Sequence, residues 1–344
     1  MQDGPCGSRK TTGILKRCTS IADLGGYPFL GQQTKILIEE TRKTKTLKDW
    51  GGKTVDIHGE GAAQRVRRRL EIKDTYEPPA GEFTLTTLAT VLCLRAFSGQ
   101  ENVDLFLDEI PSPVVPIPLL LSRNHPLLTD HLMIVDRGKT WSEIECSNYD
   151  ALHEQRKHRR TDSISKLLTE AACHGLNGDS WRMIVRTKQW DNLLENKGGD
   201  EKGQLDLFAV LRPEIFKRWK STTVAGANFK DSFFYLLGQK MGVNFEDAGF
   251  KLHFDSHQNG HRVRIKMFVE GNWSQKRQLK MHKGLTLGQH IVREVETLVG
   301  DQDLLYSAND KIQYILKGTK VPSQEWLEID GGVISALFNK ANRR

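Results

Sequence analysis

The sequence predicts an α+β protein with two domains, the second built on an antiparallel, basic-faced sheet packed on helices. Segments with strand-like and helix-like spacing alternate along the chain, which favours mixed secondary structure. Residues 196–203, Asn-Lys-Gly-Gly-Asp-Glu-Lys-Gly, contain no side chain suited to a core, which indicates a boundary. With 344 residues, 38% of them hydrophobic, the chain is long enough for two cores.

Composition suggests four regions along the chain. Residues 1–30 are rich in Gly, Ser, Thr and Lys, so we expect a flexible tail. An N-terminal α+β domain then covers residues 31–196, a linker covers 197–204, and a C-terminal α+β domain covers 205–344.

The expected elements of the N-terminal domain follow from hydrophobic spacing. The apolar run 36–38 predicts a strand, and the alternation of Val66, Leu70 and Ile72 with charged residues predicts another. Residues 84–97 have helical spacing with apolar side chains nearly all round, which predicts a buried helix. Further strands are expected over 131–135 and 181–186.

Prolines shape the middle of the chain. Four of them, at positions 111, 113, 116 and 118, remove backbone donors, so we expect a stiff extended connector and no central strand there. After the linker, the pattern predicts a strand over 205–211, a helix opened by Pro213 and a helix over 231–241.

The Asn259-Gly260 pair predicts a two-residue hairpin turn, because both positions favour positive φ. The resulting register places Phe254, Val263 and Ile265 on a core face, and a second reversal at 271–273 places Leu279 and Met281 there too. The opposite face is basic, since residues 251–283 contain eight Lys and Arg but only two acidic residues.

A helix from Thr286 and strands over 312–316 and 326–329 complete the expected C-terminal domain. The order strand, strand, helix, strand is similar to that of ubiquitin-like β-grasp domains. The segment Leu316-Lys317-Gly318-Thr319-Lys320-Val321 resembles the turn after their third strand. This resemblance implies a protein-interaction module as one alternative function.

Charge and cysteine content indicate an anionic partner and a reducing compartment. The formal net charge is +7. The five cysteines are odd in number and scattered, and residues 1–10 lack an apolar signal segment, so we expect a cytoplasmic or nuclear protein. The apolar stretches are too short or too interrupted for a transmembrane segment.

Basic side chains interleaved with an aromatic favour non-catalytic binding of an anionic polymer, with single-stranded RNA as the first choice. An anionic membrane surface and self-association are also compatible with this composition, which is similar to that of viral nucleoproteins and matrix proteins. The candidate nucleic-acid-binding residues are Lys251, Arg262, Arg264, Lys266, Phe268, Lys276, Lys280, Arg65, Arg67, Arg69, Arg156, Arg159 and Arg160.

A catalytic alternative starts from Asp56, Glu71 and Lys73, whose spacing resembles that of the PD-(D/E)xK nucleases. That resemblance implies a Mg²⁺ or Mn²⁺ ion held by the carboxylates and a water polarised by the lysine. The usual proline before the first aspartate is Val55 here. No other cofactor and no other metal is predicted.

One tetrapeptide, Gly51-Gly52-Lys53-Thr54, resembles the end of a phosphate-binding loop. The first glycine of that motif is replaced by Leu47, so the tetrapeptide does not predict a phosphate site.

Overall fold

A computed structural model describes residues 1–5, 8–59, 61–71, 81–121, 125–148, 180–195, 203–254, 256, 275–282, 284–299, 305–308, 326–329 and 332–336. The chain divides into two compact units, residues 1–258 and 259–344. Helices occur together with a parallel and an antiparallel sheet, so the expected mixture of α and β structure is confirmed.

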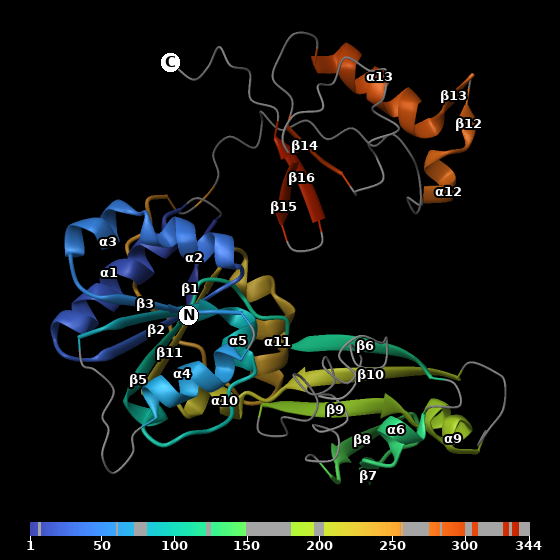
Figure 1. Cartoon of the computed structure of the whole chain (residues 1–344), viewed down its shortest axis with the longest axis horizontal. Helices are drawn as coiled ribbons and strands as arrows, with labels where there is room; N and C mark the ends of the chain where they lie inside the picture. The colour runs from blue at the N-terminus through green and yellow to red at the C-terminus, as the bar shows by residue number, and fades with distance from the viewer. Residues whose placement is uncertain are drawn as a thin grey trace. The chain divides into compact units, whose positions relative to one another are not determined.

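A six-stranded parallel sheet forms the centre of the first unit, with strand order β1-β11-β5-β2-β4-β3 (Figure 1). Because every strand runs the same way, their carboxyl ends meet at one edge, where α/β proteins bind ligands. The strands are β1 (Gln2–Asp3), β2 (Tyr27–Gln32), β3 (Thr54–Ile57), β4 (Phe83–Thr87), β5 (Val103–Leu107) and β11 (Ser221–Gly226).

Helices cover both faces of this sheet, because alternate strand residues enter different cores. Leu105 and Leu107 belong to the core under α4 and α5, whereas Phe106 belongs to the core under α1, α2 and α3. These helices are α1 (Lys10–Asp23), α2 (Lys35–Arg42), α3 (Lys45–Trp50), α4 (Ala62–Leu70) and α5 (Leu88–Leu92).

The N-terminal region corrects the expectation of a flexible tail over residues 1–30. It contains β1, α1 and the start of β2. Ile14, Leu15, Cys18 and Ala22 are spaced along one helix face and are buried, so α1 is anchored by its apolar side despite its polar composition.

Two expected strands are helices. Residues 36–38 lie in α2, and the segment around Val66 and Leu70 is α4. Ala62, Val66 and Leu70 are four residues apart and buried, a spacing that fits a helical face as well as a strand. Residues 84–97 were expected to form one helix, but β4 occupies 83–87 and Thr87 caps the short α5.

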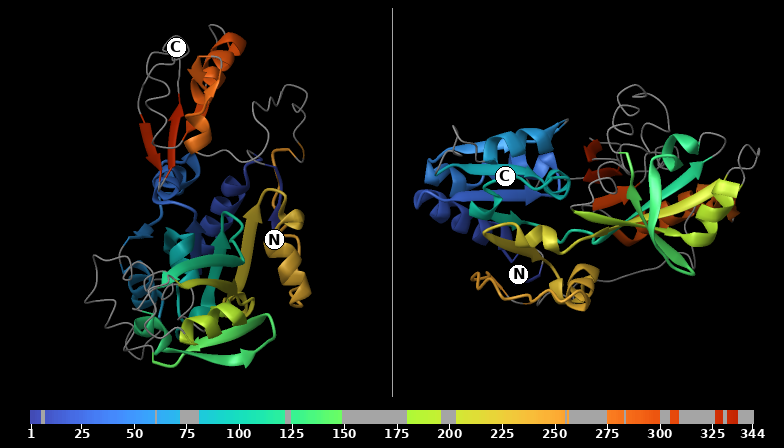
Figure 2. Two further views of the ribbon diagram at one scale, coloured as in Figure 1. Left: turned by 90° about the vertical axis from the view of Figure 1, so that its right-hand side faces the viewer. Right: turned by 90° about the horizontal axis from the view of Figure 1, so that it is seen from below.

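An antiparallel sheet of order β6-β10-β9-β8-β7 is inserted between β5 and β11 and lies beside the parallel sheet (Figure 2). The strands expected over 131–135, 181–186 and 205–211 are confirmed as β7, β9 and β10. The proline-rich segment contributes β6 at the sheet edge, where missing donors are tolerated. The elements are β6 (Val114–Leu121), α6 (Pro126–Thr129), β7 (Leu132–Arg137), β8 (Trp141–Cys146), β9 (Trp181–Arg186), α9 (Thr187–Glu195) and β10 (Gly203–Leu211).

The expected linker over 197–204 does not separate domains. β9 precedes it and β10 follows it, and these strands pair with each other. The helices expected after Pro213 and over 231–241 are confirmed as α10 (Glu214–Lys217) and α11 (Phe233–Lys240), with the 3₁₀ turn η2 (Phe229–Asp231) before α11.

In the second unit, the helix expected from Thr286 is confirmed as α13 (Leu287–Val299), and the strand over 326–329 as β15 (Trp326–Ile329). The Asn259-Gly260 hairpin and the 312–316 strand lie outside the described residues, and the β-grasp resemblance stays a prediction. The remaining elements are α12 (Gln275–Gln278), β12 (Met281–His282), β13 (Leu285–Thr286), β14 (Leu305–Ala308) and β16 (Gly332–Ala336).

The expected third strand of the basic sheet is wrong at its start. Residues 275–278 form α12, and β12 pairs with β13. Leu279 and Met281 were assigned to a core face, but their exposed fractions are 46% and 64%.

Candidate functional site

The loop after β1 lies at the carboxyl edge of the parallel sheet. β1 ends at Asp3, the chain turns, and α1 begins at Lys10. The neighbouring strand β11 pairs with β1, and β5 beside it ends at Leu107, directly before Asp108 and Glu109. The N-terminus of a long helix and two carboxylates are therefore presented at the same edge.

Lys10 folds back over this loop. Its Nζ donates to the carbonyl oxygens of Gly4 and Pro5, at 2.7 and 2.8 Å. The ammonium group therefore lies against the loop, at the positive end of α1, where an anion would be stabilised.

Thr11 connects the loop to the end of β5. Its hydroxyl donates to both carboxylate oxygens of Asp108, at 2.9 Å each. Burial raises the pKa of Asp108 to about 6, although hydrogen bonds from Thr11 and Gln32 and the charge of Lys10 act in the opposite direction. Glu109, the next residue, is exposed.

Arg9 has left-handed backbone geometry, with φ 68° and ψ 31°. Within the described part of the chain, Asn228 is the one other non-glycine residue with positive φ. This conformation favours glycine, so an arginine here carries backbone strain.

Residues 246–253, which we call the covering segment, pack against this loop. The backbone N–H of Ala248 donates to Met1 O at 2.6 Å. The backbone N–H of His253 donates to Ser8 O at 2.9 Å. A Cβ on Gly4 would lie 2.5 Å from Leu252 Cδ1 and 3.1 Å from Ser8 Oγ, so a larger residue there would displace the Leu252 side chain. Ser8 is buried, and its Oγ has no hydrogen-bond partner among the described residues.

The sequence of the loop supplies a signal that our sequence analysis missed. Residues 4–11, Gly-Pro-Cys-Gly-Ser-Arg-Lys-Thr, resemble the P-loop motif G-x-x-x-x-G-K-[ST], with Arg9 in place of the second glycine. In P-loop proteins the lysine contacts the phosphates, and the Ser or Thr holds Mg²⁺ together with an aspartate. Asp108 and Glu109, directly after the apolar β5, are a second signal.

The tetrapeptide at residues 51–54 is placed differently. It lies before β3, whereas a phosphate-binding loop follows its strand. Lys53 forms an ion pair with Glu82.

The nuclease alternative loses its geometric support. Asp56 lies on β3 and forms a 2.9 Å ion pair with Arg42. Glu71 and Lys73 were expected on one face of a strand, but the chain forms helix α4 up to residue 70. Glu71 caps the end of this helix and forms an ion pair with Arg67 at 2.9 Å. Lys73 lies outside the described residues. The described residues contain no group of three or more His, Cys, Asp or Glu that could hold a metal.

The predicted basic residues that the structure describes lie on several separate elements. Arg65 and Arg67 are exposed on α4, and Arg69 pairs with Glu82. Lys251 is exposed in the covering segment, and Lys276 and Lys280 are exposed in the second unit. The other candidates lie outside the described residues: Arg156, Arg159, Arg160, Arg262, Arg264, Lys266 and Phe268.

Two cations lie near the loop after β3, at the same edge of the sheet as the loop of residues 4–11. Arg65 Nη2 donates to His58 O at 2.7 Å. Lys35, exposed at the start of α2, has its Nζ 3.9 Å from the position that a Cβ on Gly59 would take. The carboxyl edge of the sheet therefore carries positive charge at a second place, beside residues 58–59, in addition to Lys10.

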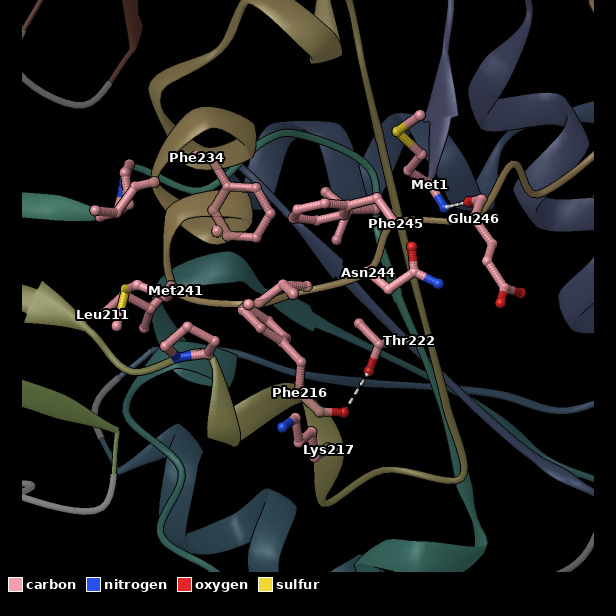
Figure 3. Close-up of a pocket in the computed structure, with 17 residues that line it drawn as sticks. Met1, Leu211, Phe216, Lys217, Thr222, Phe234, Met241, Asn244, Phe245 and Glu246 are labelled. Carbon is pink, nitrogen blue, oxygen red and sulfur yellow. Dashed lines mark hydrogen bonds between the residues drawn. The ribbon is translucent and has the colours of Figure 1, made fainter.

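A separate pocket of about 490 Å³ lies between β11, α10, α11 and residues 241–246 (Figure 3). Phe216, Phe234, Phe245 and Met241 line it, and the Thr222 hydroxyl is satisfied by Phe216 O at 3.0 Å. Its apolar character does not suit a phosphate.

In the described part of the chain, none of the helices has the length and apolar character needed to cross a bilayer. The chain matches no protein-family model, and no curated protein sequence matches it.

Proposed function

We propose that the protein binds a nucleoside triphosphate with Mg²⁺ and hydrolyses its terminal phosphoanhydride bond. The contact of the Thr11 hydroxyl with the Asp108 carboxylate, beside Lys10 at the start of α1, carries this proposal. It adds catalysis to the binding function expected from composition.

The residues present suit Mg²⁺. Magnesium prefers oxygen ligands and is held in such sites by one or two carboxylates together with substrate phosphates. Asp108 and the Thr11 hydroxyl supply such oxygens, and their 2.9 Å contact already holds them together. When bound, the ion neutralises charge on the phosphates.

The chain's own groups have separable roles in this reaction. The N–H groups at the start of α1 bind phosphate oxygens. Lys10 Nζ leaves the carbonyl oxygens of Gly4 and Pro5 and donates hydrogen bonds to the phosphate oxygens in their place. Glu109 is exposed beside Asp108, where a carboxylate can accept a proton from the attacking water.

The test is phosphate release from ATP and GTP by the full chain, with and without Mg²⁺. We expect Lys10→Ala to lower kcat/KM by about 100-fold or more, because the phosphates lose their main charge partner. Lys53→Ala is the matched control and should leave the rate unchanged. If the wild-type chain neither binds nucleotide nor releases phosphate, the proposal is wrong.

We further propose that nucleic acid is the partner on which this activity acts, as in a helicase or translocase. Lys35 and Arg65 at the carboxyl edge support this partner, since cations there can neutralise a phosphate backbone. Residues 259–344 contain 14 Lys and Arg but 9 Asp and Glu, so most of the net charge of +7 lies in the second unit.

Stimulation of phosphate release by single-stranded RNA, single-stranded DNA or anionic vesicles separates the possible partners. We expect RNA or DNA to raise kcat and vesicles to have no effect. Stimulation by vesicles alone would replace nucleic acid with a membrane surface.

A further inference from the structure

Gln32 lies at the carboxyl end of β2 and is buried, with an exposed fraction of 1%. Its Nε2 donates to Asp108 Oδ2 at 3.1 Å and to Thr41 Oγ1 at 2.8 Å. The side chain therefore joins the carboxylate of the candidate magnesium site to helix α2.

The orientation of the Gln32 amide follows from its neighbours. An ionised carboxylate can only accept hydrogen bonds, so the NH₂ group must face Asp108. Both N–H donors are then used, and Oε1 is left buried with no hydrogen-bond partner among the residues that the structure describes. Buried acceptors are rarely left unpaired, so this oxygen needs an explanation.

We propose that Gln32 is a positioning residue for the metal–nucleotide complex: Nε2 orients the Asp108 carboxylate, and Oε1 accepts a hydrogen bond from a water molecule on the bound magnesium ion. The inference rests on the proposed nucleoside triphosphatase function. Magnesium keeps several of its waters when it binds to proteins, so an acceptor beside its carboxylate ligand has a partner in the loaded site.

A purely structural role is the competing explanation, because Gln32 also ties β2 to α2 through Thr41. The two roles can be separated, since Thr41→Val removes that tie and leaves the contact with Asp108 in place. Substitution of a residue that hydrogen-bonds to a metal ligand typically weakens metal affinity by about 10- to 100-fold.

The test measures Mn²⁺ affinity by electron paramagnetic resonance, using the full chain and a non-hydrolysable ATP analogue. Gln32→Met keeps the length of the side chain but removes both polar groups, and we expect it to weaken Mn²⁺ binding by about 10- to 100-fold. Nucleotide binding in EDTA should be unchanged. Thr41→Val should bind Mn²⁺ within about twofold of wild type, because it leaves the hydrogen bond between Gln32 and Asp108 in place.

Thermal melting controls for folding. If Gln32→Met fails to fold, Gln32→Asn replaces it, since an amide one methylene shorter cannot reach both partners, and we expect the same loss of Mn²⁺ affinity. Wild-type affinity in a folded Gln32 variant, or an equal loss in Thr41→Val, overturns the inference while leaving the triphosphatase intact. A wild-type chain that binds neither nucleotide nor Mn²⁺ with nucleotide overturns both.

Discussion

The hydroxyl of Thr11 donates to both carboxylate oxygens of Asp108, although the two residues are 97 positions apart in the chain. This contact joins the first turn of α1 to the end of β5 across the edge of the sheet. It holds two oxygen groups close enough to share one cation.

Glu109→Gln should abolish hydrolysis and preserve nucleotide binding. The glutamine keeps the size of the side chain but cannot accept a proton, and loss of a general base typically costs about 10²- to 10⁴-fold in rate. Because Glu109 is exposed, the fold should be unaffected. Phosphate release and the fluorescence of a labelled ATP analogue measure the two properties, and retained turnover would remove Glu109 from the mechanism.

Asp108→Asn should stabilise the metal-free protein at pH 8. The pKa of Asp108 is raised from 3.8 to about 6 in the fold, so its stabilising contribution is present below about pH 4 and is lost as the pH rises through 6. A shift of roughly two units corresponds to about 3 kcal/mol, which is an upper bound on the gain. Urea unfolding in EDTA at pH 5 and pH 8 measures it. A variant less stable than wild type at pH 8 would contradict the prediction.

Arg9→Gly should raise the free energy of unfolding by up to about 1 kcal/mol, because glycine adopts the left-handed conformation without strain. The matched control is Arg17→Gly, on the exposed face of α1, which should lower stability by about 1 kcal/mol. Denaturant titration of both variants checks the opposite signs. Equal destabilisation would show that the Arg9 backbone is not strained.

The double variant Lys35→Gln, Arg65→Gln should weaken nucleic-acid binding and lower the slope of log affinity against log salt by about two, since two phosphate contacts are lost. Lys45→Gln with Lys48→Gln is the control, because these exposed lysines lie on α3, which precedes the amino end of β3. Titration of labelled single-stranded RNA at several salt concentrations gives both slopes. Identical slopes in the two double variants would place the interface elsewhere.

The sequence predicted the elements best where spacing and composition agreed. β9 and β15 have the expected bounds, because apolar and aromatic residues with high strand propensity are concentrated there. At the N-terminus the two signals conflicted: Gly, Thr and Lys suggested a tail, while Ile14, Leu15, Cys18 and Ala22 carried a helical face.

The candidate site could be predicted only in part. Gly4, Lys10 and Thr11 are visible as a motif, but Arg9 replaces its second glycine, and only the backbone geometry shows that this position has the positive φ that favours glycine. The partner of Thr11 depends on β1 and β5 lying on either side of β11, which is a property of the strand order. No local pattern specifies such an order.

The pairing of β1 with β11 also has a consequence for how the protein is made. Gln2 and Asp3 leave the ribosome more than two hundred residues before their partners Ala225 and Gly226. The backbone contact between Ser8 and His253 requires still more of the chain. Domains fold as units during synthesis, so a nascent or prematurely terminated chain lacks the contacts that hold the loop between β1 and α1. The loop between β1 and α1 therefore reaches its folded contacts only when the chain up to His253 has left the ribosome.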